Sequence, residues 1–122
     1  MAEPGLTPCP RLERGDKVAV IAASGPVEAS RLQRALDALN AYDLDPVVLP
    51  SARATTDPLD GGYLAGSDTQ RGADLTAALG DPAYRAVLCA RGGYGAQRTL
   101  ECVDWDAIDP KRPRVEIGRA HV

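Results

Sequence analysis

The sequence predicts an α/β fold: an open, mostly parallel, doubly wound sheet of the three-layer flavodoxin or Rossmann-like kind, expected to be incomplete. Short apolar runs alternate with helical stretches along the chain, which favours parallel strands joined by right-handed crossovers. The core must be aliphatic, because the 122 residues include no Phe, one Trp and four Tyr. Such a core suits a parallel sheet covered by helices, and an apolar fraction of 44% is enough for one ordinary domain.

The first part of the chain predicts a strand, a helix and a second strand. Residues 1–14 are a loose, Pro-rich lead-in. The run Lys17–Ala23 is apolar after its first residue and ends at Ser24-Gly25-Pro26, which is typical of a strand buried on both faces. Helical spacing extends from about Glu28 to Tyr42, and Asp45–Leu49 is the second strand. The apolar stripe of this helix consists of Leu32, Ala35, Leu36 and Leu39.

The second part predicts a long loop, a helix, a strand and a short helix. The polar stretch Ser51–Gly66 is long for an α/β connection, so a functional or flexible loop is expected. Ser67 or Asp68 caps the next helix, which ends at Gly80, and the third strand is Arg85–Ala90. The apolar residues of the two helices are Ala73, Leu75, Ala78 and Leu79 in the first and Ala96, Leu100 and Val103 in the second.

The run Arg91-Gly92-Gly93-Tyr94-Gly95 is the most informative local pattern. It follows a buried strand and opens a helix, so its glycines can adopt positive φ and bring backbone N–H groups close to an anion or a developing oxyanion. A tight turn without any ligand explains the local pattern equally well. Neither this run nor the first strand end has the G-x-G-x-x-G spacing of a dinucleotide fingerprint, so a nucleotide-dependent oxidoreductase is disfavoured and no cofactor is expected.

Charge and cysteine usage exclude several classes of partner and of site. With 14 basic and 17 acidic residues the formal charge is -3, which gives no cationic field for nucleic acid. Cys9, Cys89 and Cys102 are odd in number and form no CxxC pair, so neither a disulfide framework nor a metal site is expected. Cys89 and Cys102 are interpreted as small core residues. No apolar leader or membrane-spanning stretch occurs, so a cytoplasmic protein with no membrane partner is expected.

Other polar residues have simpler interpretations than catalysis. Ser24 ends the first strand with no histidine near it in sequence, so it is interpreted as a turn residue. The one histidine, His121, lies next to the terminus, where order is usually poor. The acidic cluster around Trp105 predicts a solvated connection with the indole packed on the sheet; its members are Asp104, Asp106 and Asp109.

Several segments together resemble the LD-carboxypeptidase (muropeptide carboxypeptidase) family of serine peptidases. The pattern Tyr-Leu-Ala-Gly-x-Asp-x-x-Arg at residues 63–71 and Arg-Gly-Gly-Tyr-Gly at residues 91–95 are far more specific together than either is alone. The resemblance extends from about Leu12 to Pro113 and includes Gly15-Asp16, Ala23-Ser24-Gly25-Pro26 and Asp81-Pro82 in the same order.

The resemblance implies a cytoplasmic hydrolase that cuts an L–D peptide bond in murein tetrapeptides during peptidoglycan recycling. Relatives cleave peptide–nucleotide conjugates, so the expected partner is one of these small peptides; a homodimeric parent is left open. The resemblance implies that the backbone of Gly92 and Gly93 helps form the oxyanion hole. The nucleophile would follow in a Gly-aromatic-Ser-Asp elbow, and a C-terminal domain would supply the histidine and glutamate. The substrate-loop candidates are Arg91, Tyr94, Gly95 and Ser24.

The sequence departs from the family pattern after Pro113, where an apolar strand and then the serine are expected but the chain continues with Arg114–Val122. If Gly118 aligns with the elbow glycine, Ala120 takes the serine position, and alanine has no oxygen to attack a carbonyl. The string GAG ATC GGA AGA GCA CAC GTC, which looks like a sequencing-library adapter, encodes residues 116–122, so this tail is expected to be artefactual.

We therefore expect an N-terminal domain over residues 15–115, no C-terminal domain, and no catalysis by the chain alone. The alternative is a non-catalytic α/β module that binds an anion at the turn Arg91–Gly95.

Overall fold

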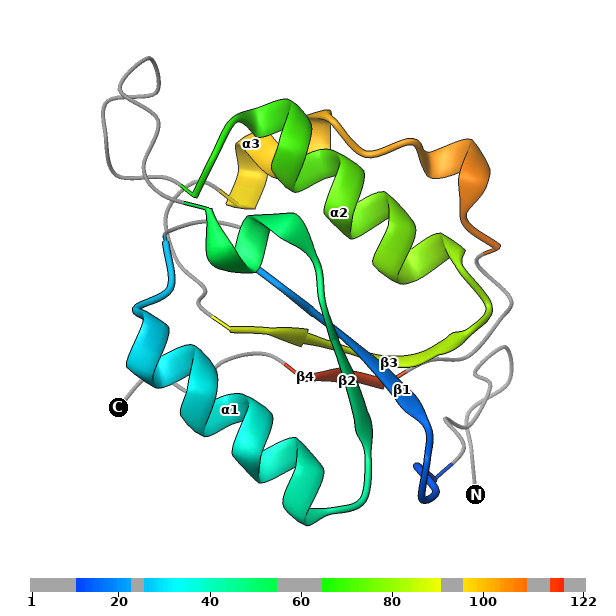
Figure 1. The fold of residues 1–122 in the computed structure, drawn as a ribbon. Helices are drawn as coiled ribbons and strands as arrows, with labels where there is room; N and C mark the ends of the chain where they lie inside the picture. Colours follow the sequence, from blue (N-terminus) through cyan, green and yellow to red (C-terminus); the bar gives the residue numbers. More distant parts are fainter. Residues whose placement is uncertain (1–10, 23–25, 55–64, 91–95, 110–114, 118–122) are drawn as a thin grey trace.

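A computed structural model describes residues 11–22, 26–54, 65–90, 96–109 and 115–117, and within them four parallel strands form one sheet in the order β2-β1-β3-β4 (Figure 1). Helices cover both faces, which confirms the predicted three-layer α/β fold. The elements in chain order are β1 (Lys17–Ile21), α1 (Ala29–Ala41), β2 (Asp45–Val48), the 3-10 helix η1 (Pro50–Arg53), α2 (Asp68–Gly80), β3 (Tyr84–Cys89), α3 (Ala96–Glu101), the 3-10 helix η3 (Trp105–Ala107) and β4 (Val115–Ile117).

The strand order explains why the helices lie on opposite faces. The chain moves outward from β1 to β2, then crosses back past β1 to β3 and continues to β4. Right-handed crossovers that run in opposite directions place their helices on opposite faces. Accordingly α1 lies on one face, while α2 and α3 lie on the other (Figure 1). The change of direction makes β1 and β3 the neighbouring strands of a topological switch point.

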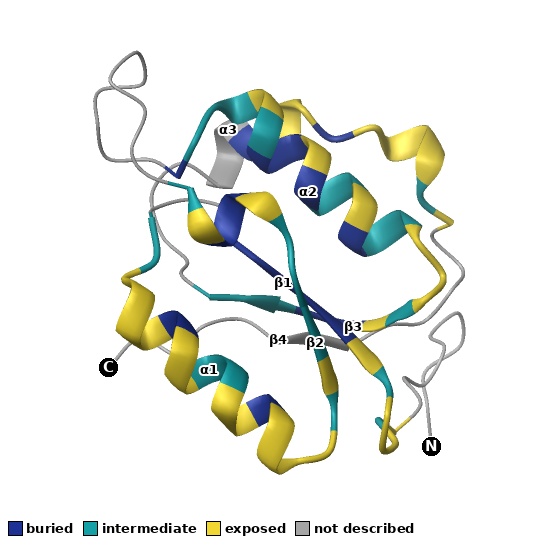
Figure 2. Ribbon diagram, in the orientation of Figure 1, coloured by how far each residue is buried: buried dark blue, intermediate teal, exposed yellow. Residues whose placement is uncertain are grey.

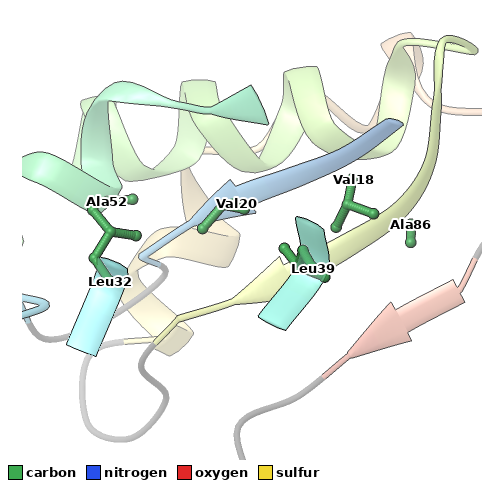
Figure 3. Close-up of a cluster of buried hydrophobic side chains, with 6 residues drawn as sticks. All are labelled: Val18, Val20, Leu32, Leu39, Ala52 and Ala86. Carbon is green, nitrogen blue, oxygen red and sulfur yellow. The ribbon is translucent and has the colours of Figure 1, made fainter. Parts of the chain in front are cut away.

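The core has two layers that share β1. The side chains of β1 alternate between the faces, and Val18, Ala19, Val20 and Ile21 are all fully buried, as predicted for a strand covered on both sides. Val18 and Val20 belong to the cluster beneath α1, which Figure 3 shows. Ala19 and Ile21 belong to the cluster beneath α2. The partners in the first cluster are Leu32, Leu39, Ala52 and Ala86, and those in the second are Ala78 and Val87.

Helix α1 forms at the predicted residues. Glu28 is its extended N-cap residue, and the helix stops where Asp43 adopts a positive φ of 60°. Leu32 and Leu39 are buried against the sheet, while the opposite side of the helix is exposed, as Figure 2 shows. The apolar stripe read from the sequence is therefore the buried face of this helix.

Helix α2 begins as predicted, and three of its predicted apolar residues, Leu75, Ala78 and Leu79, belong to or pack against the cluster of Ala19 and Ile21. Its buried face also includes polar residues that were not predicted. Ser67 is the N-cap, and its Oγ accepts a hydrogen bond from the backbone N–H of Gln70 at 3.0 Å. Ala73 is exposed, whereas Arg71 and Asp74 are buried together with Ala78. The reason is that one side of α2 packs on other helices, where polar side chains find partners.

In the segment after β3, the burial of several side chains differs from the prediction. Leu100 is exposed, and Thr99 takes the buried position next to it, while Val103 is buried as expected. Cys102 is exposed at the surface, and Trp105 is 56% exposed instead of packing on the sheet. Both α3 and η3 pack against α2 (Figure 1), and this contact leaves Leu100, Cys102 and Trp105 exposed.

The loop predicted over Ser51–Gly66 contains a short helix at its start. Its first residues form η1, in which Ser51 and Ala52 are fully buried. Residues 55–64 lie outside the described part of the chain, so the long functional loop expected there stays a prediction.

Candidate functional site

The carboxyl ends of β1 and β3 lie side by side at one edge of the sheet. The backbone N–H of Ala90, just after β3, donates to the carbonyl of Ile21 at the end of β1 at 2.8 Å. Helices α1 and α2 begin on this same side of the molecule, at the left in Figure 1. In open α/β sheets ligands bind outside the carboxyl ends of strands at a switch point, so this edge is the candidate site.

The residues that the sequence nominated for this site lie outside the described residues. They follow the two adjacent strand ends: Ser24 comes shortly after Ala22, and the turn Arg91–Gly95 begins directly after Ala90. Their roles stay predictions, although the described flanks of both segments meet at the same edge. The nominated residues are Ser24, Arg91, Gly92, Gly93, Tyr94 and Gly95.

A buried polar chain fixes the end of β1. The Oγ of Ser51 accepts a hydrogen bond from the backbone N–H of Ala22 at 3.0 Å. The N–H of Ser51 donates to Asp74 Oδ2 at 2.5 Å, and Asp74 Oδ1 accepts from Gln70 Nε2 at 3.0 Å. Ser51 is fully buried and Asp74 nearly so. Helix α2 therefore holds the strand end from which residues 23–25 depart.

A second buried group on the same helix reaches α3. Arg71 is fully buried, and its Nε donates to Thr99 Oγ1 at 2.9 Å. Its Nη1 donates to the carbonyls of Ala65 at 3.2 Å and Gly66 at 2.9 Å, and its Nη2 pairs with the Asp68 carboxylate. The buried positive charge is thus matched by a carboxylate and three neutral oxygens, as burial of a guanidinium requires.

Sequence reasoning missed this network, although a signal was present. Arg71, Asp74 and Ala78 recur at i, i+3 and i+7, which is the spacing of one helix face. A search for apolar residues alone overlooks a stripe in which two of three members are charged. Arg71 also ends the Tyr-Leu-Ala-Gly-x-Asp-x-x-Arg segment, but the resemblance assigned it no role.

On the other face of the sheet, a cavity of about 340 Å³ lies between α1 and the end of β3. Its size is within the range of small-molecule sites, and two arginines belong to its lining. Cys89, expected in the core, packs against the cluster beneath α2 but is only half-buried. The lining residues are Arg31, Arg34, Ala35, Leu88, Cys89 and Ala90.

The described residues contain neither a metal-binding cluster nor a membrane-spanning helix. No group of three or more His, Cys, Asp or Glu side chains there could hold a metal ion. No helix in the described part of the chain has the length and apolar character needed to cross a bilayer.

Removing the Asp74 carboxylate is expected to destabilise the chain by about 2 kcal/mol, because Asp74→Ala leaves the buried N–H of Ser51 without its acceptor. The measurement is urea unfolding followed by far-UV circular dichroism. The chain offers a matched control, since exposed Asp37 accepts from Gln33 Nε2 at 2.9 Å with the same four-residue spacing as Asp74 and Gln70. Asp37→Ala should change stability by no more than about 0.5 kcal/mol. Equal effects would contradict the buried role of Asp74.

Comparison with known proteins identifies relatives of the domain. The family model for the LD-carboxypeptidase N-terminal domain matches residues 18–119. A Streptomyces coelicolor protein, named as a carboxypeptidase, is 54% identical to this chain over 108 residues. These residues are 88% of this chain and 34% of that protein. The murein tetrapeptide carboxypeptidase of Pseudomonas aeruginosa is 45% identical over 56 residues, or 46% of this chain and 18% of that enzyme.

Solved structures share the fold. The microcin C7 self-immunity protein MccF, in complex with glutamyl sulfamoyl guanosine, matches with a TM-score of 0.74 at 22% identity. The match covers 89% of this chain and 32% of MccF. The chain thus spans about a third of the length of both MccF and the Streptomyces relative.

Proposed function

Since this chain belongs to the LD-carboxypeptidase family, whose N-terminal domain it carries, we propose that it is the substrate-binding and oxyanion-binding part of a serine carboxypeptidase. The proposed substrate is a murein tetrapeptide, whose terminal D-residue is removed from the preceding L-centre. The proposed enzyme acts in the cytoplasm during peptidoglycan recycling. Relatives named as carboxypeptidases, one of them for murein tetrapeptide, support this assignment.

The observation that carries the proposal is the meeting of β1 and β3 at the switch point. The N–H of Ala90 is bound to the carbonyl of Ile21 at 2.8 Å, so the segments that follow these strands leave from one place. One of those segments is the glycine-rich turn at residues 91–95. Backbone N–H groups of such a turn are suited to bind the oxyanion of a tetrahedral intermediate.

The proposed reaction follows acyl-enzyme chemistry. A serine from the rest of the full-length protein attacks the carbonyl carbon of the L–D bond while a histidine takes its proton. The N–H groups of Gly92 or Gly93 stabilise the resulting oxyanion. When the C–N bond breaks, the histidine returns the proton to the departing D-amino acid. Water then attacks the acyl-enzyme, which releases the shortened peptide and restores the serine.

The test is a cleavage assay on the full-length protein. We expect release of D-alanine from a tetrapeptide that ends in an L–D bond, and at least about a hundredfold slower release of L-alanine from the L–L stereoisomer, because the inverted substituent displaces the scissile carbonyl from the oxyanion donors. A peptide–nucleotide conjugate serves as the second substrate, since MccF is solved with glutamyl sulfamoyl guanosine. Preference for the conjugate would replace the murein assignment, and cleavage of neither would overturn the peptidase assignment.

One observation favours the second candidate, a non-catalytic anion-binding module. Arg31 and Arg34 line the cavity beside the end of β3, where they provide positive charge for a carboxylate or phosphate. The proposed turn Arg91–Gly95 would provide backbone donors for the same class of ligand. Titration of the 122-residue chain with phosphate and with acetate distinguishes the two candidates, because tight binding by this chain alone favours the module.

A further inference from the structure

The cavity between α1 and the end of β3 has no role in the proposed reaction. Its volume is about 340 Å³, and its walls come from these two elements. Arg31, Arg34 and Ala35 form the helical wall, and they share one face of α1 because positions i, i+3 and i+4 of a helix are neighbours. The opposite wall consists of residues 88–90, which are the last two residues of β3 and the one that follows.

The strand wall of this cavity is largely apolar. Leu88 and Ala90 are half-buried and pack against the cluster beneath α1, so their side chains lie on the α1 face of the sheet. The backbone N–H of Ala90 donates to the carbonyl of Ile21 at 2.8 Å, which places this wall at the carboxyl edge of the sheet. An apolar surface strengthens the attraction between charges beside it, because it displaces water.

The two arginines of the cavity form no ion pair within the described part of the chain. The nearby carboxylates are bound elsewhere: Glu28 accepts from Ser30 Oγ at 2.6 Å, and Asp37 accepts from Gln33 Nε2 at 2.9 Å. The pKa of the Glu28 carboxyl is lowered first by the Ser30 hydrogen bond and also by the charges of the two arginines. Their positive charge is therefore available to an anion that enters the cavity.

The chemistry of both walls fits a carboxylate carried by a small apolar group. Guanidinium groups bind the oxygens of carboxylates and phosphates alike. However, alanine and leucine side chains would leave the sugar hydroxyls of a nucleotide without hydrogen-bond partners, whereas they suit the side chain of a small amino acid. The substrate of any carboxypeptidase ends in such a residue with a free carboxylate.

We infer that this cavity is a carboxylate subsite, in which Arg31 and Arg34 bind the terminal carboxylate of a peptide and Leu88 contacts its last side chain. The assignment of the ligand to a peptide substrate rests on the proposed function, whereas the cavity and its charge do not. The two arginines contact the substrate without taking part in bond cleavage. Their loss therefore raises KM and leaves kcat nearly unchanged.

The first test measures binding to the full-length protein without catalysis. The probes are acetyl-D-alanine and its amide, which lacks only the negative charge. We expect the parent to bind the acid at least about tenfold more tightly than the amide, and Arg31→Gln and Arg34→Gln each to reduce this ratio at least about threefold. Arg85→Gln is the matched control, because Arg85 is exposed at the opposite end of β3 and does not line the cavity. Its ratio should equal that of the parent, and isothermal titration calorimetry gives the Kd values.

A variant that fills the cavity distinguishes contact from long-range attraction. Ala35→Leu keeps both arginines and places a good helix former on α1, but it enlarges a side chain of the lining. We expect Ala35→Leu to weaken binding of the acid and of the amide at least about fivefold. If it binds the acid as tightly as the parent does, the ligand is not inside this cavity and the inference is wrong.

Kinetic measurements separate the inference from the proposed function. For a tetrapeptide that ends in an L–D bond, each arginine variant should raise KM at least about threefold, with kcat changed less than about twofold. If no L–D peptide is cleaved but the arginine variants lose the preference for the acid, the proposed function fails and the subsite stands. If the peptide is cleaved but both arginine variants match Arg85→Gln in Kd and KM, the subsite fails and the proposed function stands. Equal binding of acid and amide by the parent, or tighter binding of inorganic phosphate than of the acid, overturns the carboxylate subsite whatever the activity.

Discussion

The 122-residue chain by itself is expected to release no measurable D-alanine from a murein tetrapeptide, whereas release is expected from the full-length protein. The proposal assigns the nucleophile, its histidine and the glutamate to the rest of the full-length protein, and if Gly118 aligns with the elbow glycine, Ala120 takes the serine position. Loss of the nucleophile or base of a serine peptidase lowers kcat by roughly 10⁶-fold. The measurement is D-alanine release, detected with a D-amino acid oxidase assay at equal molar concentrations of the two proteins.

A variant of the full-length protein provides the control for this comparison. Replacing its elbow serine with alanine removes the nucleophile but leaves both domains in place, so its activity should fall to the level of the isolated chain. Comparable circular dichroism spectra and Tm values for the variant and the parent establish that both are folded. D-alanine release by the isolated chain, above the level of the serine variant, would contradict the assignment of nucleophile and base to the rest of the protein.

The elements whose buried positions are all filled by apolar residues were predictable from sequence. Lys17–Ile21 is a strand buried on both faces, so a continuous apolar run identifies it without ambiguity. Helix α1 has one apolar face and one solvated face, and its stripe containing Leu32 and Leu39 is the buried one. In both cases each buried position is filled by an apolar residue, and periodicity then reports burial directly.

The polar face of α2 was not predictable by the same reasoning. Arg71 and Asp74 face η1, α3 and the strand end, where backbone and hydroxyl groups from distant segments supply their partners. Those partners exist only in the folded chain, because Ser51 and Thr99 are far from α2 in sequence. Trp105 shows the converse error: a large aromatic residue suggests packing on the sheet, but η3 packs against α2, and Trp105 remains 56% exposed.

The candidate site was predictable as a location. Parallel strands joined by crossovers place ligand chemistry at the carboxyl edge, and the two nominated segments follow the adjacent ends of β1 and β3. The individual roles of Ser24 and of residues 91–95 depend on conformations outside the described residues, so they stay predictions. What the structure adds is the support behind the site, namely two buried charged side chains on a single helix.

Arg71→Leu is expected to destabilise the chain by about 3–5 kcal/mol, the largest stability effect among the substitutions considered. The leucine cannot donate to Ala65, Gly66 or Thr99, so buried oxygens lose their partner, and Asp68 loses its opposite charge. A domain of this size is stabilised by only about 5–15 kcal/mol in total, so Arg71→Leu is expected to remove a large share of its stability. Guanidinium chloride unfolding at 25 °C measures the change.

Two further substitutions test why Arg71 matters. Arg71→Lys keeps the positive charge but has a single terminal nitrogen, which cannot reach Thr99 and the two loop carbonyls together. We therefore expect its free energy of unfolding to lie between those of the parent and Arg71→Leu. Arg31→Leu provides the matched control, because Arg31 lies at a similar depth into helix α1 but is exposed, and its replacement should cost no more than about 0.5 kcal/mol. If Arg71→Leu unfolds at the same denaturant concentration as Arg31→Leu, the buried guanidinium does not hold α2, α3 and the loop together. If Arg71→Lys is as stable as the parent, charge alone suffices and the directional bonds of the guanidinium are dispensable.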